Sequence, residues 1–596
     1  MIGRMFNPAC FGTIKFRGFF QGIAIGGLLA VSGQASAEET LAEKLRKETQ
    51  RAEYEAVETK TIVELQQFRE TSSLETETRQ SITLTQLNPV INSWALMGVA
   101  NGNVGKQIVY HIENGDPAGQ KISLESKPKA HLAISGKTGV YRCIPWQGER
   151  SQLVRARDSG LPFSPICGGR IFVRNKVRGS RTNLEATTEF LRDNIWLGED
   201  LVGFVKSSFF KDSKMETLEQ VAFKTEGIAP KGLIKARLEG EPPVIRARVG
   251  FRLNGAPDGK MAVGAWYPLT DVPGMYAATM QPRLISREIL SDKGTANRLD
   301  GIESQALSYF IAFDLSLYDV GYELGTDHPR IDWSSRPSGA GRNYKIPGPD
   351  GVKSPSPVVN LGMVSPSQTK KTVATFTGGF KRDHGAWRFG PWATQNHGTH
   401  YGFIVHGVVE SKLQNELSTF YVLDDGTIEM KTWREEDNKL LPRIRFARQN
   451  GVAIIERNAE TGVSMPGPLV PNWGGGNWSG SAEADLRTLR AGACIREQDG
   501  QKFLIYGYFS TATPSAMART FQAFSCDYAM LLDMNAVEHT YLAVYARKDG
   551  ALQTQHLVPG MAQIDKRNSD GNPIPRFLGF SDNRDFFYLT RREESE

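Results

Sequence analysis

The spacing of apolar and polar residues predicts different elements in successive parts of the chain. From Glu38 to Arg79 there is no glycine or proline, and apolar residues recur at helical spacing among lysine, arginine and glutamate. This pattern predicts a charged, solvated helix over residues 38–80. Its heptads do not persist, so both an exposed N-terminal helix and a weak coiled-coil stalk fit it.

Strict alternation of apolar and polar residues follows the charged segment. The run Ile82-Thr83-Leu84-Thr85-Gln86-Leu87 and the Asn-Gly turns at 101–102 and 114–115 predict a β-rich domain over residues 81–180.

The middle of the chain, residues 181–333, mixes helical and strand patterns. Thr182 and Glu185 have the spacing of a capping box at the start of a helix. We expect a further helix around Glu303–Phe313, among strands, in an α+β region whose role no motif indicates.

Proline and glycine crowd residues 334–357, and few of the residues between them are apolar. This composition is typical of a linker or a long surface loop. We therefore expect a C-terminal domain over residues 358–596.

A strand–helix–strand unit is the clearest part of that domain. Residues 503–509 are apolar and aromatic, Thr513-Pro514 starts a helix with an N-cap and a first-turn proline, and residues 528–532 form the next strand. Strands joined by a helix are expected to be parallel, with a right-handed crossover.

Polar side chains follow the second of these strands. Asp533 ends the strand, and Asn535, Glu538 and His539 come directly after it. Ligands gather beyond the carboxyl ends of parallel strands, so these residues are a candidate acid–base cluster. An aspartate at a strand end also serves as a turn former.

The first 37 residues carry the pattern of an export signal. Lys15 and Arg17 precede an apolar run from Phe19 to Val31, and the small residues Ala35-Ser36-Ala37 follow. We predict a signal peptide over residues 1–37, cleaved after Ala37, and a periplasmic or secreted protein with no integral membrane segment. An uncleaved anchor is the weaker alternative, because the apolar run rises only about 20 Å as a helix, against a hydrocarbon core of ~30 Å.

Composition and charge exclude some classes of protein. The 596 residues are 40% hydrophobic and 23% charged, which excludes a polytopic membrane protein and a wholly disordered chain. The net charge is +6, and it falls to +3 without the three cations of the first 37 residues. No basic face is clustered along the chain, so we expect no nucleic-acid partner.

Four cysteines remain after the predicted cleavage. In an exported protein an even number suggests disulfides, and four cysteines allow three pairings. We favour Cys143 with Cys167 and Cys494 with Cys526, the pairs closest in sequence. Four buried free thiols are the alternative, whereas the absence of Cys-x-x-Cys excludes a zinc ribbon.

Six of the nine histidines lie between His384 and His556. On a strand over residues 400–406, His400 and His406 share a face but lie about 20 Å apart, too far to bind one metal ion. His397 and His400 are closer, but they have no two further ligands nearby. We predict no metal site and no cofactor, although the pattern leaves a divalent cation open; hydrogen-bonded and catalytic histidines fit equally well.

Two glycine-rich stretches complete the candidate chemistry. Gly378 and Gly379 follow a strand, and Trp473 and Trp478 flank a Gly-Gly-Gly-Asn loop that includes Asn477. Glycines let a ligand approach backbone N–H groups, and the indole rings suit a sugar face. Tight turns and core packing explain both stretches equally well.

The order of these elements resembles the phosphodiester glycosidase family. A Gly-Gly-Phe element after a strand comes first, followed by histidine-rich strands, Leu489-Arg490-Ala491-Gly492, the Thr513-capped helix and a strand ending in Leu-Leu-Asp. The resemblance covers residues 370–545, roughly 30% of the chain. It implies an α/β domain that hydrolyses a sugar-phosphate diester.

If the domain is such a hydrolase, we hypothesise the following roles for its polar residues. Asp533 would act at the anomeric centre or as general base, His539 would carry the proton, and Glu538 would orient His539. Arg490 stands at the family's arginine position and would hold phosphate. The N–H groups of Gly378 and Gly379 would bind an oxyanion.

The chain departs from both family motifs. Thr377 and Lys381 replace the Asn and the second Phe of Asn-Gly-Gly-Phe-Phe, and Met534-Asn535-Ala536-Val537 replaces Gly-Gly-Gly-Ser after Leu-Asp. The lost glycines remove close backbone approach to a substrate. Either the polar residues rebuild the site for another substrate, or the domain has lost activity; we favour a rebuilt site because the replacements are polar and clustered.

The expected fold class is multidomain α+β, with β-rich and α+β regions before a C-terminal α/β domain built on a mixed sheet. We expect an exported hydrolase acting on a sugar-phosphate diester or a related envelope or extracellular glycan. The alternative is a non-catalytic glycan-binding or scaffold protein of the cell envelope. No Gly-x-Ser-x-Gly or His-Glu-x-x-His motif supports a peptidase. The predicted substrate-binding residues are Arg490, Asn535, Gly378, Gly379, His400, Asn477 and Trp478.

Overall fold

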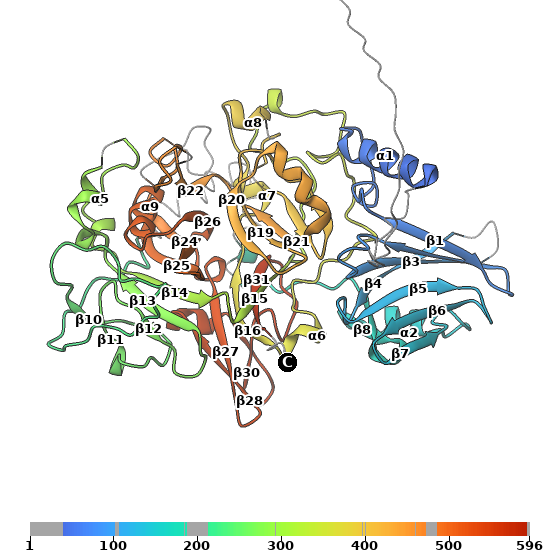
Figure 1. The fold of residues 1–596 in the computed structure, drawn as a ribbon, viewed down its shortest axis with the longest axis horizontal. Coiled ribbons are helices and arrows are strands. Elements are labelled where there is room, and N and C mark those ends of the chain that lie inside the picture. The colour runs from blue at the N-terminus through green and yellow to red at the C-terminus, as the bar shows by residue number, and fades with distance from the viewer. Residues whose placement is uncertain are drawn as a thin grey trace, which may run out of the picture. The chain divides into compact units, whose positions relative to one another are not determined.

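Strands predominate over helices in this protein, as the computed structural model shows (Figure 1). The structure describes residues 40–592 except 102–105, 184, 188–211, 293, 396, 400, 459 and 473–485. The predicted signal peptide therefore lies outside the described residues. By their contacts, residues 1–46 and residues 47–596 form two separate units.

The N-terminal helix is shorter than predicted. Helix α1 spans Leu41–Glu55, and strand β1 begins at Glu70. Between them Ile62 and Leu65 are fully buried in turns rather than placed on a helix. The helix ends before these two apolar residues, because they pack into the hydrophobic core instead.

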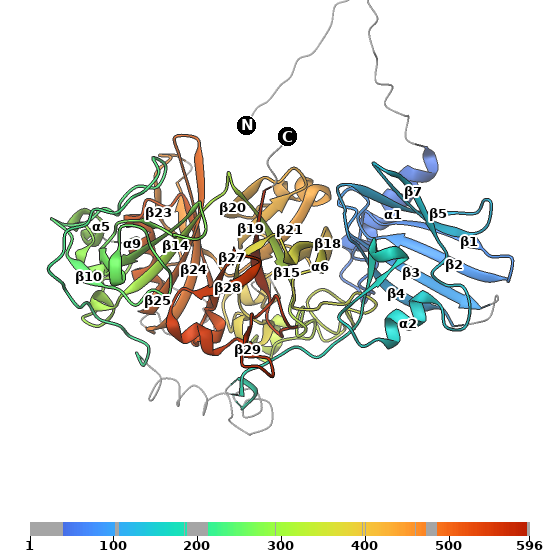
Figure 2. The ribbon, with the colours of Figure 1, turned by 90° about the horizontal axis from the view of Figure 1, so that it is seen from below.

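The residues predicted to be β-rich form two antiparallel sheets with their own hydrophobic core (Figures 1 and 2). The disulfide between Cys143 and Cys167 joins residues from this region and confirms the predicted pairing. The six-stranded sheet has the order β1 (Glu70–Glu75), β2 (Gln80–Gln86), β3 (Trp94–Asn101), β4 (Ile108–Asn114), β9 (Ile171–Arg174) and β8 (Phe163–Ile166). The three-stranded sheet contains β5 (Gln120–Glu125), β6 (His131–Gly136) and β7 (Gly139–Cys143).

An eight-stranded sheet joins distant parts of the chain. The helix predicted around Glu303–Phe313 is wrong: only the 3-10 turn Glu303–Gln305 is helical, and Ser308–Asp314 is a strand. This segment is rich in aromatic residues and is buried on both faces, which suits a central strand. The order is β12 (Tyr267–Pro268), β13 (Met275–Met280), β14 (Ser308–Asp314), β25 (Gln501–Ala512), β24 (Thr488–Gln498), β26 (Tyr528–Met534), β22 (Ala453–Arg457) and β23 (Ser464–Pro466).

The predicted strand–helix–strand unit is present as β25, α9 (Pro514–Ala523) and β26. Both strands pair antiparallel with β24, which lies between them, so β25 and β26 run in the same direction, as predicted. The ladder pairings of the described strands are antiparallel, so the expected mixed sheet is corrected to an antiparallel one. The disulfide between Cys494 and Cys526 confirms the second predicted pairing.

Two five-stranded sheets complete the main framework. The first has the order β15 (Tyr318–Glu323), β31 (Phe586–Arg591), β16 (Thr372–Thr377), β27 (Leu542–Lys548) and β28 (Ala551–His556). The second has the order β18 (Val408–Ser411), β17 (Phe403–Val405), β21 (Ile444–Gln449), β19 (Ser418–Leu423) and β20 (Ile428–Thr432). Shorter elements are α2 (Gln152–Asp158), α5 (Arg287–Ser291), α6 (Pro366–Thr369), α7 (Arg382–Gly385), α8 (Pro391–Gln395), β10 (Val244–Arg246), β11 (Lys260–Ala262), β29 (Lys566–Arg567) and β30 (Pro573–Ile574).

Residues 334–357 do not separate two independent folds, in contrast to the predicted linker. Strands β13 and β14 precede this segment but share a sheet with β24, β25 and β26. The segment itself contributes to the interior, because Asp350 and Val352 are buried in it and Arg382 forms an ion pair with Asp350 at 2.8 Å. Among the described residues, no helix is both long and apolar enough to cross a membrane.

Candidate functional site

Asp533 lies at the end of β26, where the predicted acid–base cluster was placed. Its backbone N–H donates to the carbonyl of Gly378 at 3.1 Å, so the end of β26 meets the loop after β16. Asn450, at the end of β21, joins the same two segments: its amide oxygen accepts from Phe380 N–H at 3.1 Å, and its Nδ2 donates to the carbonyl of Leu531 at 2.7 Å. Two stretches more than 150 residues apart in the printed sequence thus come together around Asp533.

Arg584 is the central cation of the cluster. It comes from the segment just before β31 and donates from Nη1 to Asp533 Oδ2 at 2.7 Å. It also donates from Nη2 to Glu185 Oε1 at 2.8 Å and to His539 Nε2 at 2.7 Å. One guanidinium therefore connects two carboxyl groups and an imidazole, and all four side chains are buried or half-buried.

The contacts of His539 define its protonation. Arg584 has no acceptor atom, so His539 Nε2 must accept, and Nδ1–H donates to the carbonyl of Met534 at 2.8 Å. His539 is therefore a neutral imidazole with its proton on Nδ1 in this arrangement. It holds Arg584 in place from the turn that follows β26.

Glu185 reaches the cluster from the short helical segment that Thr182 caps. The Thr182 hydroxyl accepts from the Glu185 N–H at 3.1 Å, which confirms half of the predicted capping box. One oxygen, Oε1, accepts from Arg584, from Lys381 at 3.3 Å and from Asn583 at 2.9 Å. The Glu185 side chain thus acts at the cluster rather than as a helix cap.

Burial and charge move the pKa values of the two carboxyl groups in opposite directions. Asp533 is 4% exposed, and burial raises its pKa to about 6 even though Arg584 opposes the shift. Burial also acts to raise the pKa of Glu185, but Arg584 and Lys381 outweigh it and hold that pKa well below the ordinary range. The difference follows from the larger number of cationic donors at Glu185.

A third carboxyl group, that of Asp585, organises the other side of the cluster. Its Oδ2 accepts from Arg448 Nε at 2.9 Å, from the Tyr322 hydroxyl at 2.7 Å and from Gly379 N–H at 3.3 Å. Arg448 and these hydrogen bonds overcome the effect of burial and lower the pKa of Asp585. His328 Nε2 lies 3.6 Å from Asp585 Oδ1, and burial lowers the pKa of this histidine to about 4.

The cluster of side chains around Arg584 is in contact with solvent at Asp327. This side chain is 25% exposed and pairs with Arg181, which is 37% exposed, at 2.7 Å. On the inner side Asp327 accepts from Lys381 at 3.1 Å. Asp327 and His328 precede the proline- and glycine-rich segment, and both reach the site in the C-terminal part of the chain.

Arg490 does not join the cluster. In the sheet it lies opposite Met534, so its side chain and that of Met534 share one face, while Asp533 points to the other. The guanidinium donates to the carbonyls of Ala512 at 2.8 Å and Leu486 at 3.1 Å. Burial lowers its pKa to about 9. Its predicted phosphate contact is corrected, because strand alternation turns Arg490 away.

Two further predicted residues have other partners. Glu538 Oε1 accepts from the Thr182 hydroxyl at 3.2 Å, so Glu538 does not orient His539. Asn535 has a φ of 78°, which asparagine tolerates, and its side chain accepts from Thr488 at 3.0 Å.

The glycine N–H groups are also occupied. Gly378 N–H donates to the backbone carbonyl of Asp585 at 2.9 Å, and Gly379 N–H donates to its side chain. These two groups therefore hold Asp585 instead of presenting an open oxyanion site. The predicted residues His400, Asn477 and Trp478 lie outside the described residues.

The remaining histidine prediction concerns His406. It lies in the turn between β17 and β18, and its Nε2 contacts Glu323 Oε1 at 2.6 Å, away from Asp533. Within the described part of the chain, no three His, Cys, Asp or Glu side chains are arranged to hold a metal ion.

The sequence analysis missed Arg584, Asn583 and Asp585. These residues form a dense polar run directly before the apolar strand β31. The same pattern, polar residues next to a buried strand, singled out Asp533 and could have pointed to this run. Glu185 offered no comparable signal, because only the tertiary fold brings it across 399 residues to Arg584.

The chain has only distant similarity to known proteins. No protein family and no curated protein matches the sequence. A solved structure of the zebrafish N-acetylglucosamine-1-phosphodiester alpha-N-acetylglucosaminidase catalytic domain, auto-inhibited by its pro-peptide, matches 55% of this chain and 85% of its own at 11% identity, with a TM-score of 0.27. A putative exported protein from Burkholderia pseudomallei matches 48% of this chain and 74% of its own at 9% identity, with a TM-score of 0.16. These similarities support at most a distant relationship in fold.

Proposed function

We propose that this protein is an exported hydrolase of the glycosidase type, acting on a sugar-phosphate diester or a related envelope or extracellular glycan. One observation carries the proposal: Asp533 and Glu185 bind the same guanidinium, while their pKa values are moved in opposite directions. Glycosidases depend on two carboxyl groups whose pKa values are held apart, so that one titrates near neutral pH while the other stays ionised.

The chemistry of a sugar-phosphate diester suits this pair. Breaking the bond between the anomeric carbon and the phosphate oxygen releases a phosphomonoester, which is a stable anion near neutral pH. Demand for a strong acid at the leaving group is therefore low. Glu185 stabilises positive charge at the anomeric carbon, and Asp533, once deprotonated, accepts a proton from the attacking water.

Positive charge for the phosphate comes from Lys381 and Arg584. Both side chains are buried, and a guanidinium or ammonium in a buried site forms strong hydrogen bonds with phosphate oxygens. They replace Arg490 in the role that the sequence suggested. His539 is a positioning residue, because it contacts Arg584 rather than the reacting atoms.

The substrate reaches the cluster at the exposed edge formed by Asp327 and Arg181. These two side chains are more exposed than Asp533, Glu185 or Lys381. Lys381 pairs with Asp327 on its inner side, so we propose that a substrate that displaces Arg181 from Asp327 reaches Lys381 first. This order of events places the charged end of a substrate next to the cations before its sugar reaches Glu185.

Export of the protein is part of the proposal. Two disulfides, Cys143–Cys167 and Cys494–Cys526, are typical of proteins that fold in an oxidising compartment. A periplasmic or secreted location also gives access to envelope and extracellular glycans.

The alternative function is a non-catalytic glycan-binding or scaffold protein of the cell envelope. The burial of Asp533, at 4% exposure, and its ion pair with Arg584 favour this alternative, since a closed ion network also serves as structural support. Turnover of a substrate separates the two functions, because a scaffold binds the glycan and leaves it intact.

The proposal is tested by measuring sugar release from a sugar-1-phosphodiester by the full chain. We expect turnover by the wild type and at least a hundredfold loss in Asp533→Asn. Glu410→Gln is the matched control: Glu410 is buried outside the cluster, and burial raises its pKa to about 8, so an amide preserves its neutral state at pH 7. Equal rates in wild type and Asp533→Asn would remove Asp533 from the chemistry.

A further inference from the structure

A small hollow lies in the β-rich region, on residues that the proposed active site does not use. Its volume is about 160 Å³, and its walls come from β5, the hairpin of β6 and β7, and Arg170. The volume is below the roughly 300 Å³ typical of sites for drug-sized ligands. The hollow therefore suits a single small unit, such as one sugar residue.

Arg170 and Tyr141 form the polar end of this hollow. The guanidinium carbon of Arg170 lies 4.1 Å from the centre of the Tyr141 ring, and Tyr141 is 37% exposed. Among the described residues Arg170 forms no ion pair, so its guanidinium contacts an aromatic ring while its charge is left without a carboxylate partner there. A planar guanidinium stacked on a ring keeps its N–H edge directed outward, where it can bind a carboxylate or phosphate through two hydrogen bonds.

The disulfide holds these two side chains in place. Tyr141 precedes Cys143 by two residues on β7, and Arg170 follows Cys167 by three. The bond between Cys143 and Cys167 therefore fixes the two walls against each other. Less conformational entropy is lost when a ligand binds to walls that are already ordered.

The other groups that line the hollow suit a polyhydroxyl ligand. Gln120 Nε2 donates to Asn114 at 2.7 Å and to the carbonyl of Arg170 at 2.8 Å, so its amide oxygen is the atom that it offers to a ligand. Thr138 and Tyr141 add hydroxyl groups, and Val140 adds an apolar surface. Sugars present the same combination of hydroxyl groups and C–H faces.

We propose that the hollow around Tyr141 and Arg170 is a binding site for a saccharide unit that carries an acidic group. The acidic group pairs with Arg170, and the sugar hydroxyls bond to Gln120, Thr138 and Tyr141. This site holds a glycan to the protein independently of chemistry at Asp533. Carboxylate and phosphate share the recognition by Arg170, and the probes below distinguish them.

The test is a saturation-transfer NMR titration of the full chain with glucuronic acid, glucose 1-phosphate and glucose. We expect one or both acidic sugars to bind at least tenfold more tightly than glucose. Arg170→Ala should weaken that binding at least tenfold. Arg170→Lys should restore only part of it, since an ammonium lacks the planar pair of donors.

Arg142→Ala is the matched control. Arg142 lies next to Tyr141 on β7 but points to the opposite face of the strand, and it is also exposed. Its loss should leave the affinity unchanged, whereas Tyr141→Ala should weaken binding and Tyr141→Phe should weaken it less. Intact disulfides and an unchanged melting temperature confirm that each variant is folded.

The outcome separates this site from the proposed hydrolase. Asp533→Asn should bind the acidic sugars as the wild type does, even where it has lost turnover. Absence of binding by the wild type, equal binding of glucose and the acidic sugars, or unchanged binding in Arg170→Ala would each overturn the site.

Discussion

At the scale of single residues, Arg584 decides what the candidate site is able to do. Its guanidinium contacts Asp533, Glu185 and His539, and each of these contacts is between 2.7 and 2.8 Å. The two carboxyl groups have different pKa values because Lys381 and Asn583 also donate to Glu185, whereas Asp533 depends chiefly on Arg584. The acid–base assignment follows from this unequal distribution of donors.

The rate of sugar release should depend on pH through the titration of Asp533. Because burial raises its pKa to about 6, the carboxyl group is protonated below that pH and acts as a base above it. We expect kcat/KM to rise as the pH rises through about 6 and to level off above pH 7. Rates measured from pH 4.5 to 8 test this, and a flat wild-type profile would contradict a general base with this pKa.

The stability of the folded protein should also depend on pH, through the titration of Glu410. Burial raises the pKa of Glu410 to about 8 in the folded state, above its ordinary value of 4.5. The folded chain then holds a proton that the unfolded chain has released, so stability falls as the pH rises between these two values, by up to about 5 kcal/mol. Glu410→Gln should melt with the wild type at pH 5 and several degrees above it at pH 8.

Thermal melting at the two pH values measures this difference directly. Asp425→Asn is a suitable control, because Asp425 is half exposed and its pKa is lowered rather than raised. A constant gap between wild type and Glu410→Gln from pH 5 to pH 8 would show that Glu410 does not titrate in this range.

At the scale of elements, a glycine of β24 allows α9 to pack on the central sheet. Gly492 of β24 lies directly opposite Gly507 of β25. A Cβ atom on Gly492 would lie 2.7 Å from Met517 Cε and 3.0 Å from Phe521 Cε2, both on α9. The missing side chain therefore gives α9 its place beside β24, β25 and β26 (Figure 1).

Gly492→Val should consequently destabilise the fold through overpacking. We expect a loss of about 1–3 kcal/mol, because the contacts include the backbone oxygen of Met530 and cannot all be relieved by side-chain movement. Gly301→Val is the control, since a Cβ on Gly301 would meet nothing within 4 Å. Melting temperatures of the two variants measure the effect; equal values would show that α9 shifts freely.

Several elements were predictable because their signals are local. The Thr513 cap is present, with its hydroxyl accepting from Ala516 N–H at 3.2 Å, and β25 and β26 run in the same direction, as predicted. The strand at Ser308–Asp314 was mistaken for a helix, because a short apolar run has no decisive period. Its neighbours β13 and β25 determine its conformation, and β25 is nearly 200 residues away.

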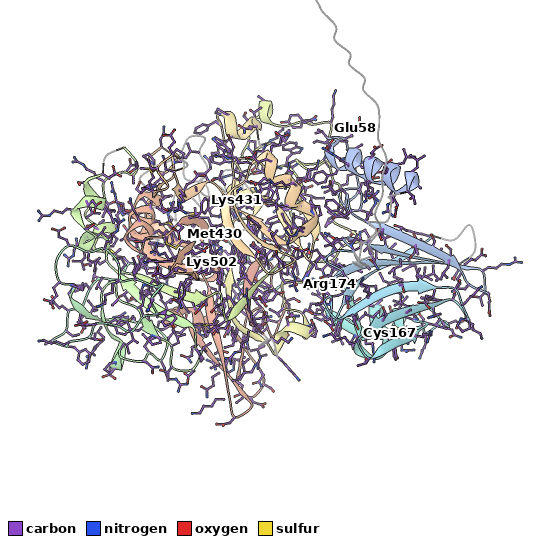
Figure 3. The ribbon with its side chains drawn as sticks, in the orientation of Figure 1. Glu58, Cys167, Arg174, Met430, Lys431 and Lys502 are labelled. Atoms are coloured by element: carbon purple, nitrogen blue, oxygen red, sulfur yellow. A yellow bond between two sulfur atoms is a disulfide. The ribbon has the colours of Figure 1, made fainter. Side chains whose placement is uncertain are left out.

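At the scale of the whole molecule, Arg174 connects the β-rich region to the sheets that carry the site. Arg174, which is labelled in Figure 3, comes from β9 and forms ion pairs with Glu113 of β4 and with Glu323 of β15, the latter at 3.3 Å. Its Nε donates to the carbonyl of Val359 at 3.1 Å. Its side chain is fully buried and is the guanidinium that both carboxylates share.

Arg174→Ala should weaken this connection strongly. The substitution removes the guanidinium that two buried carboxylates share, and loss of one partner from a buried ion pair typically costs about 3–5 kcal/mol. We expect a lower melting temperature and faster proteolysis of the chain segment between β9 and Thr182. Arg142→Ala, on the exposed face of β7, should change neither measurement, and identical behaviour of the two variants would contradict a supporting role for Arg174.

Features that depend on neighbouring residues could be predicted from the sequence. These include the two cysteine pairings, the alternating strands after residue 80, the Thr513 cap and the position of Asp533 at a strand end. Each arises from spacing or from chemistry within about thirty residues. These features can be predicted because strand alternation and helix capping depend on residues that are close together in the sequence.

Which side chains meet depends on the tertiary fold. It turned Arg490 away from Asp533 through strand register and brought Glu185, Lys381 and Arg584 together from three distant segments. It also joined strands from both sides of residues 334–357 in one sheet. Burial of apolar surface drives these long-range contacts, and because that force has no direction, a linear pattern cannot specify the partners.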